Sequence, residues 1–366
     1  MSVPNISLKS LTLHLTRVLV SRIAYLIKRK NIEERNILAV TYTKKAANEM
    51  KSRLRSILGK DKNRIDAEGA NKPVSKIGKT EALVLTCCTL HSLCCRNLRI
   101  HSELEKDREF TVLDTSDCIK IVKGLMKSKT DCKDFSPRIV HMAISTIKRQ
   151  MLKKNGFQFE EGAYRIADGL MYEYDLTLQF NNAKDYDDII LHTVNLLLKN
   201  GSDAKAIRSK YQHILCDEWQ DVDKSQYILM MLLLNDSVRL SRFGEDLEDY
   251  VKVNNIKINR NTPKNMEKVH GSTNSRRTLF VVGDSFQTIY SWRGADNKNL
   301  DYFEQDLPGY VVFVFCVIFA TEKCHHIYNT IQYNTIQYIT IQYNTMQYNA
   351  ILYNTIQCNT IQYNTM

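Results

Sequence analysis

Two adjacent carboxylates, Asp217 and Glu218, directly follow the apolar stretch His213-Ile-Leu-Cys216. Apolar residues followed by two acids are the pattern of a Walker B segment, in which one carboxylate holds Mg²⁺ and the next polarises an attacking water. An acidic pair alone would fit two solvated acids after a strand equally well. The longer string Asp217-Glu-Trp-Gln-Asp221, with Gln226 behind it, is more specific and favours the chemical interpretation.

A second polar group follows the apolar run Thr278–Val282. It contains Gln287, and a glutamine near a γ-phosphate can orient water or sense hydrolysis. Tyr290, Trp292 and Arg293 come next, and aromatic rings beside a basic side chain suit stacking on the bases of single-stranded DNA. Taken alone, an aromatic pair of this kind more often belongs to a hydrophobic core.

Two further polar groups, Thr41-Tyr-Thr-Lys-Lys45 and Thr89-Leu-His-Ser92, stand where apolar runs give way to helical patterns. Hydroxyls and backbone N–H groups at a helix start are natural phosphate contacts. The candidates for such contacts are Thr41, Tyr42, Thr89 and His91. A single histidine is more often structural, so His91 becomes a candidate only together with its neighbours.

The elements that must position these groups alternate between strands and helices. Strands are predicted at 37–43, 82–86, 213–216 and 278–282, and helices at 16–28, 44–58, from about 91, and at about 225–234. This alternation predicts an α/β fold with a parallel sheet covered on both faces. Ligands of such sheets bind at the carboxyl ends of the strands. We therefore expect the four polar groups to meet at one edge of the sheet.

Three segments fall outside this alternation. Residues 101–207 are helical in pattern and predict a helical insertion, whereas 235–276 are polar without a period and predict a long surface loop. From Tyr328 to Met366 the unit Tyr-Asn-Thr-Ile-Gln repeats every five residues. That period matches neither a strand nor a helix and indicates a translated simple-sequence repeat. The alternative is a disordered arm rich in Asn, Gln and Tyr.

Composition limits the class of protein. The net charge of +11, from 51 Lys and Arg against 40 Asp and Glu, favours a polyanionic partner, although a basic protein without a nucleic-acid role stays possible on charge alone. The ten cysteines include no C-x-x-C pairs with zinc-type spacing, so we expect a reducing intracellular compartment. The longest apolar run, Tyr310–Ala320, is too short to span a bilayer, so no membrane partner is expected.

The order and the residues of these segments resemble the conserved motifs of the UvrD/Rep-type DNA helicases of superfamily 1. Asn36–Arg53 resembles motif Ia, Asp217–Asp221 resembles motif II and Val282–Asp296 resembles motif III. Thr89–Ser92 resembles the next DNA-contacting motif, and Asp185-Tyr-Asp-Asp-Ile-Ile190 resembles the acidic stretch before motif II. The resemblance covers about Thr16 to Val312. It implies a RecA-like P-loop NTPase sheet with an inserted helical subdomain.

The resemblance also implies roles and boundaries. Asp217 and Thr16 would hold Mg²⁺ beside ATP, Glu218 would be the catalytic base, and Gln287 would couple the γ-phosphate to DNA. Tyr42 and Trp292 would stack on bases. The residues expected near the strand are Thr41, Thr89, His91, Tyr290 and Arg293. The expected parts are 16–100 and 208–312 for motor domain 1A, 101–207 for subdomain 1B, and 313–366 for a disordered tail.

The activity implied is ATP-dependent 3′-to-5′ translocation on single-stranded DNA, or at a junction of single- and double-stranded DNA, in repair and recombination. By analogy with eukaryotic relatives the expected compartment is the nucleus. Protein partners are not implied.

The chain departs from the family at the phosphate-binding loop. Leu13-His-Leu-Thr16 occupies that slot, with Leu15 in the lysine position and His14 in a glycine position. Gly78-Lys-Thr80 resembles the end of such a loop, but Pro73 occupies the first glycine position and a strand, not a helix, is predicted to follow. We therefore expect weak ATP binding. Since no second motor domain is recognisable, the alternative function is an incomplete, inactive helicase with weak single-stranded DNA binding.

Overall fold

The computed structural model describes most of the chain up to residue 283 and short segments beyond it. The described residues are 8–59, 84–101, 108–127, 129, 134–150, 161–234, 247, 250–252, 256, 277–283, 295, 299, 312–316 and 336–340. The chain divides into two compact units, Met1–Tyr302 and Phe303–Met366, and each is described by itself.

Four parallel strands form the central sheet of the first unit, in the spatial order β2-β1-β5-β6. The strands are β1 (Ile37–Thr41), β2 (Thr86–Thr89), β5 (His213–Cys216) and β6 (Thr278–Val281). All five residues of β1 are buried, as expected for a central strand of a sheet covered on both faces. The predicted α/β class with a parallel sheet is confirmed.

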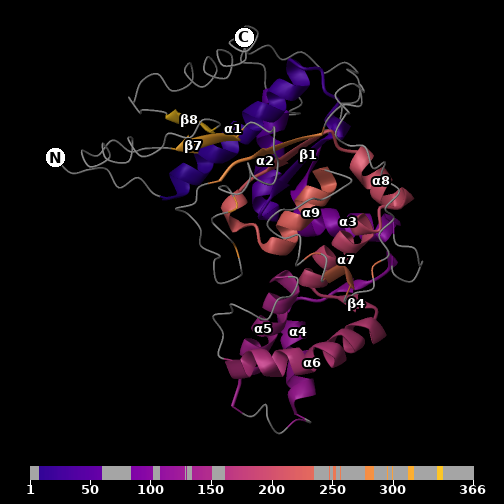
Figure 1. The fold of residues 1–366 in the computed structure, drawn as a ribbon. Helices are drawn as coiled ribbons and strands as arrows, with labels where there is room; N and C mark the ends of the chain where they lie inside the picture. The colour runs from indigo at the N-terminus through magenta and orange to yellow at the C-terminus, as the bar shows by residue number, and fades with distance from the viewer. Residues whose placement is uncertain are drawn as a thin grey trace, which may run out of the picture. The chain divides into compact units, whose positions relative to one another are not determined.

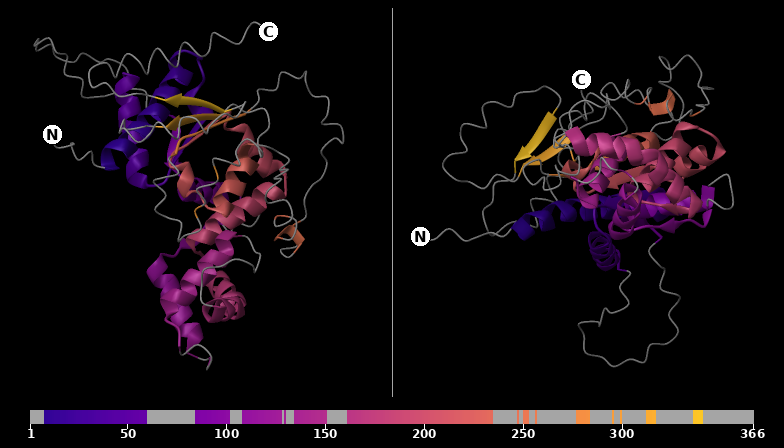
Figure 2. Two further views of the ribbon diagram at one scale, coloured as in Figure 1. Left: turned by 60° about the vertical axis from the view of Figure 1, so that its left-hand side comes forward. Right: turned by 90° about the horizontal axis from the view of Figure 1, so that it is seen from below.

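Helices pack around this sheet (Figures 1 and 2). The helices of the sheet region are α1 (Leu8–Lys28), α2 (Lys44–Ile57), α3 (Leu90–His101) and α9 (Lys224–Leu234). Apolar residues at helical spacing on α2 bury Ala47, Met50 and Leu54, whereas α9 is buried on nearly every side. In the described part of the chain no helix combines the length and apolar composition needed to cross a membrane.

Between α3 and β5 the described chain is mainly helical. Its elements are β3 (Thr111–Val112), α4 (Thr115–Met126), α5 (Pro137–Gln150), α6 (Glu161–Phe180), β4 (Ala183–Lys184), α7 (Tyr186–Leu198) and α8 (Ser202–Ser209). Helices α4, α5 and α6 lie side by side around one apolar cluster that includes Val122, Ile144 and Leu170 (Figure 1). Helix α5 also contacts α7 within the insertion, and its contact with α9 fastens the insertion to the sheet region.

Two predicted boundaries differ from the structure, and so does the small part of the predicted loop 235–276 that lies among the described residues. The second strand runs over Thr86–Thr89, not 82–86, because its residues must pair in register with Leu38–Thr41 of β1. Helix α1 begins at Leu8, upstream of the predicted start at Thr16. Within the predicted surface loop 235–276, Tyr250 is buried and its hydroxyl donates to Asn195 Oδ1 at 2.9 Å, so an aromatic anchor ties this segment to α7.

The second unit contains one described pair of parallel strands, β7 (Val312–Cys316) and β8 (Ile336–Thr340). β8 lies in the repeat tract, for which we predicted disorder. Its sequence Ile-Gln-Tyr-Ile-Thr is rich in the β-branched and aromatic residues that favour strands. A five-residue period therefore does not prevent a short strand from forming.

Candidate nucleotide and nucleic-acid site

Asp217 and Thr16 meet at the carboxyl end of β5. Thr16 Oγ1 donates to Asp217 Oδ2 at 3.1 Å, which joins positions 201 residues apart in the sequence. The other oxygen, Asp217 Oδ1, is buried and has no hydrogen-bond partner in the part of the chain described here. Burial, followed by the charge of Glu218, raises the pKa of Asp217 to about 7. This side chain therefore has an oxygen available for a cation.

The donor set fits Mg²⁺. One carboxylate and one hydroxyl are hard oxygen ligands, and Mg²⁺ is usually held by one or two carboxylates together with substrate phosphates and waters. No group of three or more His, Cys, Asp or Glu side chains among the described residues could hold a metal. A metal here would thus depend on Thr16, Asp217 and the phosphates of a bound nucleotide.

Glu218 has a backbone conformation that few residues other than glycine adopt. Its φ of 55° and ψ of 48° lie in the left-handed region. The turn is held from both sides, because the Asp217 amide donates to Val40 O at 2.9 Å and the Trp219 amide donates to Val282 O at 3.0 Å. Such conformations persist where the surrounding structure imposes them, often at functional sites. Here it directs the side chain of Glu218 out of the strand.

Gln220 and Gly283 support this turn. Gln220 is 1% exposed and its Nε2 donates to Glu218 Oε2 at 2.7 Å, which orients the carboxylate. A Cβ on Gly283 would lie 2.5 Å from Gln220 Oε1 and 3.1 Å from the Trp219 amide nitrogen. A side chain at position 283 would therefore displace the buried Gln220 amide and crowd the backbone of the Glu218 turn. We assigned no role to either residue from the sequence, although both lie in the quoted motifs.

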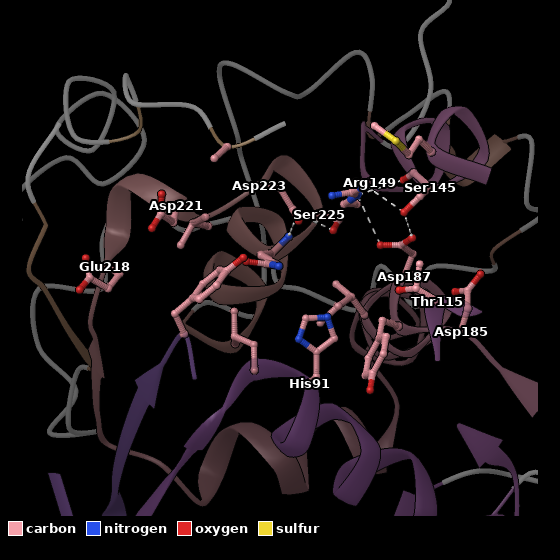
Figure 3. A pocket seen from close by; sticks show the side chains of 18 of the residues that line it. His91, Thr115, Ser145, Arg149, Asp185, Asp187, Glu218, Asp221, Asp223 and Ser225 are labelled. Carbon is pink, nitrogen blue, oxygen red and sulfur yellow. Dashed lines mark hydrogen bonds and ion pairs between the residues drawn. The ribbon is translucent and has the colours of Figure 1, made fainter. Parts of the chain in front are cut away.

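A cavity of about 420 Å³ brings several predicted residues together (Figure 3). Thr41, Tyr42 and His91 line it together with Asp217 and Glu218. They come from the ends of β1, β2 and β5, so three of the four polar groups converge at one sheet edge as expected, whereas most of the fourth, after β6, lies outside the described residues. The ring of His91 contacts Tyr186 of α7 edge-on, with 5.5 Å between centroids.

The two predicted threonines have local partners. The Thr41 side chain is buried and donates to Thr43 O at 3.0 Å. Thr89 does not line the cavity; its Oγ1 accepts from the Ser92 amide at 3.2 Å at the start of α3. A DNA contact by either hydroxyl stays a prediction. Gln287, Tyr290, Trp292 and Arg293 lie outside the described residues, and their predicted roles stay predictions as well.

The opposite wall of the cavity comes from the helical insertion, and we did not predict it. It includes Arg138, Ser145 and Arg149 of α5 and Asp187 of α7. Figure 3 shows Asp187 joined to Ser145 and Arg149. Burial, followed by the charge of Asp185, raises the pKa of Asp187 to about 7. The acidic string 185–190 was visible in the sequence, but no sequence pattern indicated its partners on α5.

The segment at the position of the family's phosphate-binding loop is helical. Residues Leu13 to Thr16 lie within α1, which runs without a break from Leu8 to Lys28. In a helix interior each amide donates to the carbonyl four residues earlier. A phosphate cradle instead needs amides that point at the ligand from a helix start. The backbone and Leu15 together therefore lack the features that hold phosphates in this class of site.

Comparison with known proteins agrees with the site. The model of the UvrD/REP helicase N-terminal domain matches residues 16–246 and 264–308. The chain belongs to the UvrD/REP helicase family. It is 33% identical over 297 residues to the ATP-dependent DNA helicase PcrA of Staphylococcus epidermidis, a match that covers 80% of this chain and 33% of that protein.

A second relative gives the same picture. PcrA of Staphylococcus aureus is 32% identical over 297 residues, again with 80% of this chain and 33% of the relative covered. The chain thus spans about a third of the length of these helicases. The sheet is accordingly the RecA-like sheet of a UvrD-type helicase. This family is ATP-dependent and acts on DNA, which implies ATP, Mg²⁺ and DNA as its ligands.

Proposed function

We propose that this chain is the first motor domain of an ATP-dependent 3′-to-5′ DNA helicase, with 16–100 and 208–312 forming the motor and 101–207 the inserted subdomain. The observation that carries the proposal is the contact of Thr16 with Asp217 at 3.1 Å beside the left-handed Glu218. Metal-binding and water-activating groups of a phosphoryl-transfer site lie together there. Tyr42 and His91 line the same cavity as Asp217 and Glu218, so a DNA strand bound there would lie close to the nucleotide.

The roles of the residues follow from their positions. Bound Mg²⁺ would supply charge neutralisation at the phosphates, and Thr16 and Asp217 would hold it. Glu218 would orient and deprotonate the attacking water, with its carboxylate kept in place by Gln220 at 2.7 Å. Tyr42 would stack on a base of the strand. Single-stranded DNA next to a duplex junction is the proposed substrate, and DNA repair or recombination is the proposed process.

A second function is favoured by one specific observation. Leu15 stands in the lysine position, and α1 continues through the cradle slot from Leu8. Without the cationic side chain and the free amides, nucleotide would be held poorly even with Asp217 and Thr16 intact. The second candidate is therefore single-stranded DNA binding by this chain without ATP hydrolysis.

ATP turnover and DNA binding, measured on the same preparation, separate the two functions. The helicase function predicts Mg²⁺-dependent turnover that oligo-dT stimulates and that Glu218→Gln abolishes. Glu33→Gln, at a surface ion pair with Arg35 outside the cavity, is the matched control and should keep the wild-type rate. Strand displacement from a duplex with a 3′ tail, but not from one with a 5′ tail, tests the direction.

The second function predicts oligo-dT binding with no turnover above the Glu218→Gln background. Failure to bind oligo-dT at low salt would contradict both functions. Robust unwinding that Glu218→Gln removes would reject the inactive alternative.

A further inference from the structure

Helix α5 presents one face to the cavity. Its lining residues are Arg138, His141, Met142, Ser145 and Arg149. Their spacing of three, four, seven and eleven residues from Arg138 is that of a single helical face. Tyr42 and His91 line the same cavity from the sheet. A ligand that enters from the Tyr42 side therefore meets α5.

The charge of the lining is mainly negative. Six carboxyl groups line the cavity, from Asp185, Asp187, Asp217, Glu218, Asp221 and Asp223. Burial raises the pKa of two of them, Asp187 and Asp217, to about 7. Two guanidinium groups, Arg138 and Arg149, oppose them. Burial lowers the pKa of His141, which disfavours a positive charge on this imidazole. A phosphate would be repelled from the carboxylate-lined interior and must be held at a cationic position.

The two arginines differ in what they contact. Arg149 has partners within the protein. Its Nε donates to Ser145 O at 3.1 Å, and it forms an ion pair with Asp187 at 3.5 Å. Arg138 is exposed, and in the ranges that the structure describes it makes no ion pair or hydrogen bond. Its guanidinium can present a planar set of donors to a phosphate.

We propose that Arg138 binds a backbone phosphate of the single strand whose base lies at Tyr42. This inference rests on the DNA-binding part of the proposed function and names a further positioning residue for it. The neutral base can enter the cavity beside the carboxylates, while the charged phosphate stays at the arginine.

Fluorescence anisotropy of labelled oligo-dT, titrated at several salt concentrations, tests the proposal on the full chain. Arg138→Gln should weaken binding about three- to ten-fold at low salt and reduce the slope of log K against log salt by roughly 0.7, the value for one phosphate contact on a single strand. Arg138→Lys keeps the charge and should retain most of the salt slope.

Arg165→Gln is the matched control. Arg165 lies on α6 of the same insertion, is exposed, has no described partner and does not line the cavity. Equal weakening by Arg138→Gln and Arg165→Gln would mean a diffuse charge effect and would overturn the proposal. Loss of binding in Tyr42→Ala with none in Arg138→Gln would overturn it while leaving the proposed DNA site intact. No binding by the unaltered chain would overturn both.

Discussion

Lys148 joins α5 to the start of α7 within the insertion through a buried ionic cluster. The side chain of Lys148 is 5% exposed, and its Nζ lies 3.0 Å from Asp185 Oδ2, 2.6 Å from Asp188 Oδ1 and 3.0 Å from Asp175 Oδ1. The hydroxyl of Tyr174 also donates to Asp185 Oδ2, at 3.0 Å. Burial acts to lower the pKa of Lys148, but the three carboxylates outweigh it and hold that pKa well above its ordinary value.

We predict that Lys148→Met destabilises the chain strongly. Methionine fills nearly the same volume, so the main effect is to leave Asp185 and Asp188 buried without their counter-charge. Removing one partner of a buried ion pair costs about 3–5 kcal/mol. Because domains are typically stable by about 5–15 kcal/mol, this loss should move the unfolding midpoint clearly. Packing of α5 against α7 should loosen first, since Lys148 joins these helices.

Urea unfolding followed by far-ultraviolet circular dichroism measures the loss. Lys120→Met is the matched control, because Lys120 forms an ion pair with Asp117 in which the lysine side chain is 73% exposed. Exposed pairs contribute little, so the midpoint of the control should stay at the wild-type value.

The loss should depend on pH with a definite sign. With Lys148 present, burial already raises the pKa of Asp188 to about 6, whereas the lysine charge holds the pKa of Asp185 below its ordinary value. Without Lys148 we expect the pKa of Asp188 to rise further and that of Asp185 to rise above its unfolded value. The variant then loses stability as pH increases through that raised range. The deficit relative to wild type should therefore be larger at pH 8 than at pH 5. A Lys148→Met midpoint equal to that of Lys120→Met at pH 8, or a deficit that grows on acidification, would refute this reasoning.

Three further predictions concern the site. Gly283→Ala brings a Cβ to 2.5 Å from a Gln220 oxygen and should lower the free energy of unfolding in urea by about 1–3 kcal/mol. The control Gly169→Ala has open space on α6 and should raise that free energy by about 0.5–1 kcal/mol, so equal effects of the two variants would contradict the close approach. The unaltered chain should bind Mg-ATP weakly because Leu15 replaces the lysine, and a micromolar affinity by calorimetry would disprove this. Trp292→Ala should cost about 1–3 kcal/mol of oligo-dT binding if the ring stacks on a base, and unchanged binding by a folded variant would assign Trp292 to the core.

Local pattern was enough to predict the class of fold and the chemical character of its sheet edge. Buried runs such as Ile37–Thr41 and His213–Cys216 predicted strands because both faces of a central parallel strand are covered, so nearly every residue is apolar. Asp217 and Glu218 could be assigned because the acids directly follow such a run. The order of motifs then identified the family, which the comparisons confirm.

Boundaries were predicted less well where pairing, not composition, decides them. The apolar run at 82–86 looked like the strand, but register with β1 shifts the strand to Thr86–Thr89. In the same way Tyr250 stands in a polar segment, and its burial and its hydrogen bond to Asn195 make it an anchor. Such partners lie tens of residues away, and periodicity does not report them.

By itself, then, the sequence determined the parallel α/β sheet, the helicase family and the acids of motif II, because these depend on neighbouring residues and on the order of motifs. Tertiary structure alone decided the rest. The contact between Thr16 and Asp217, the left-handed turn at Glu218 and the wall of α5 with Arg138 each arise from segments brought together across long stretches of chain. Packing and hydrogen bonds between elements far apart in the sequence set such geometry, and the pattern of neighbouring residues carries no information about these contacts.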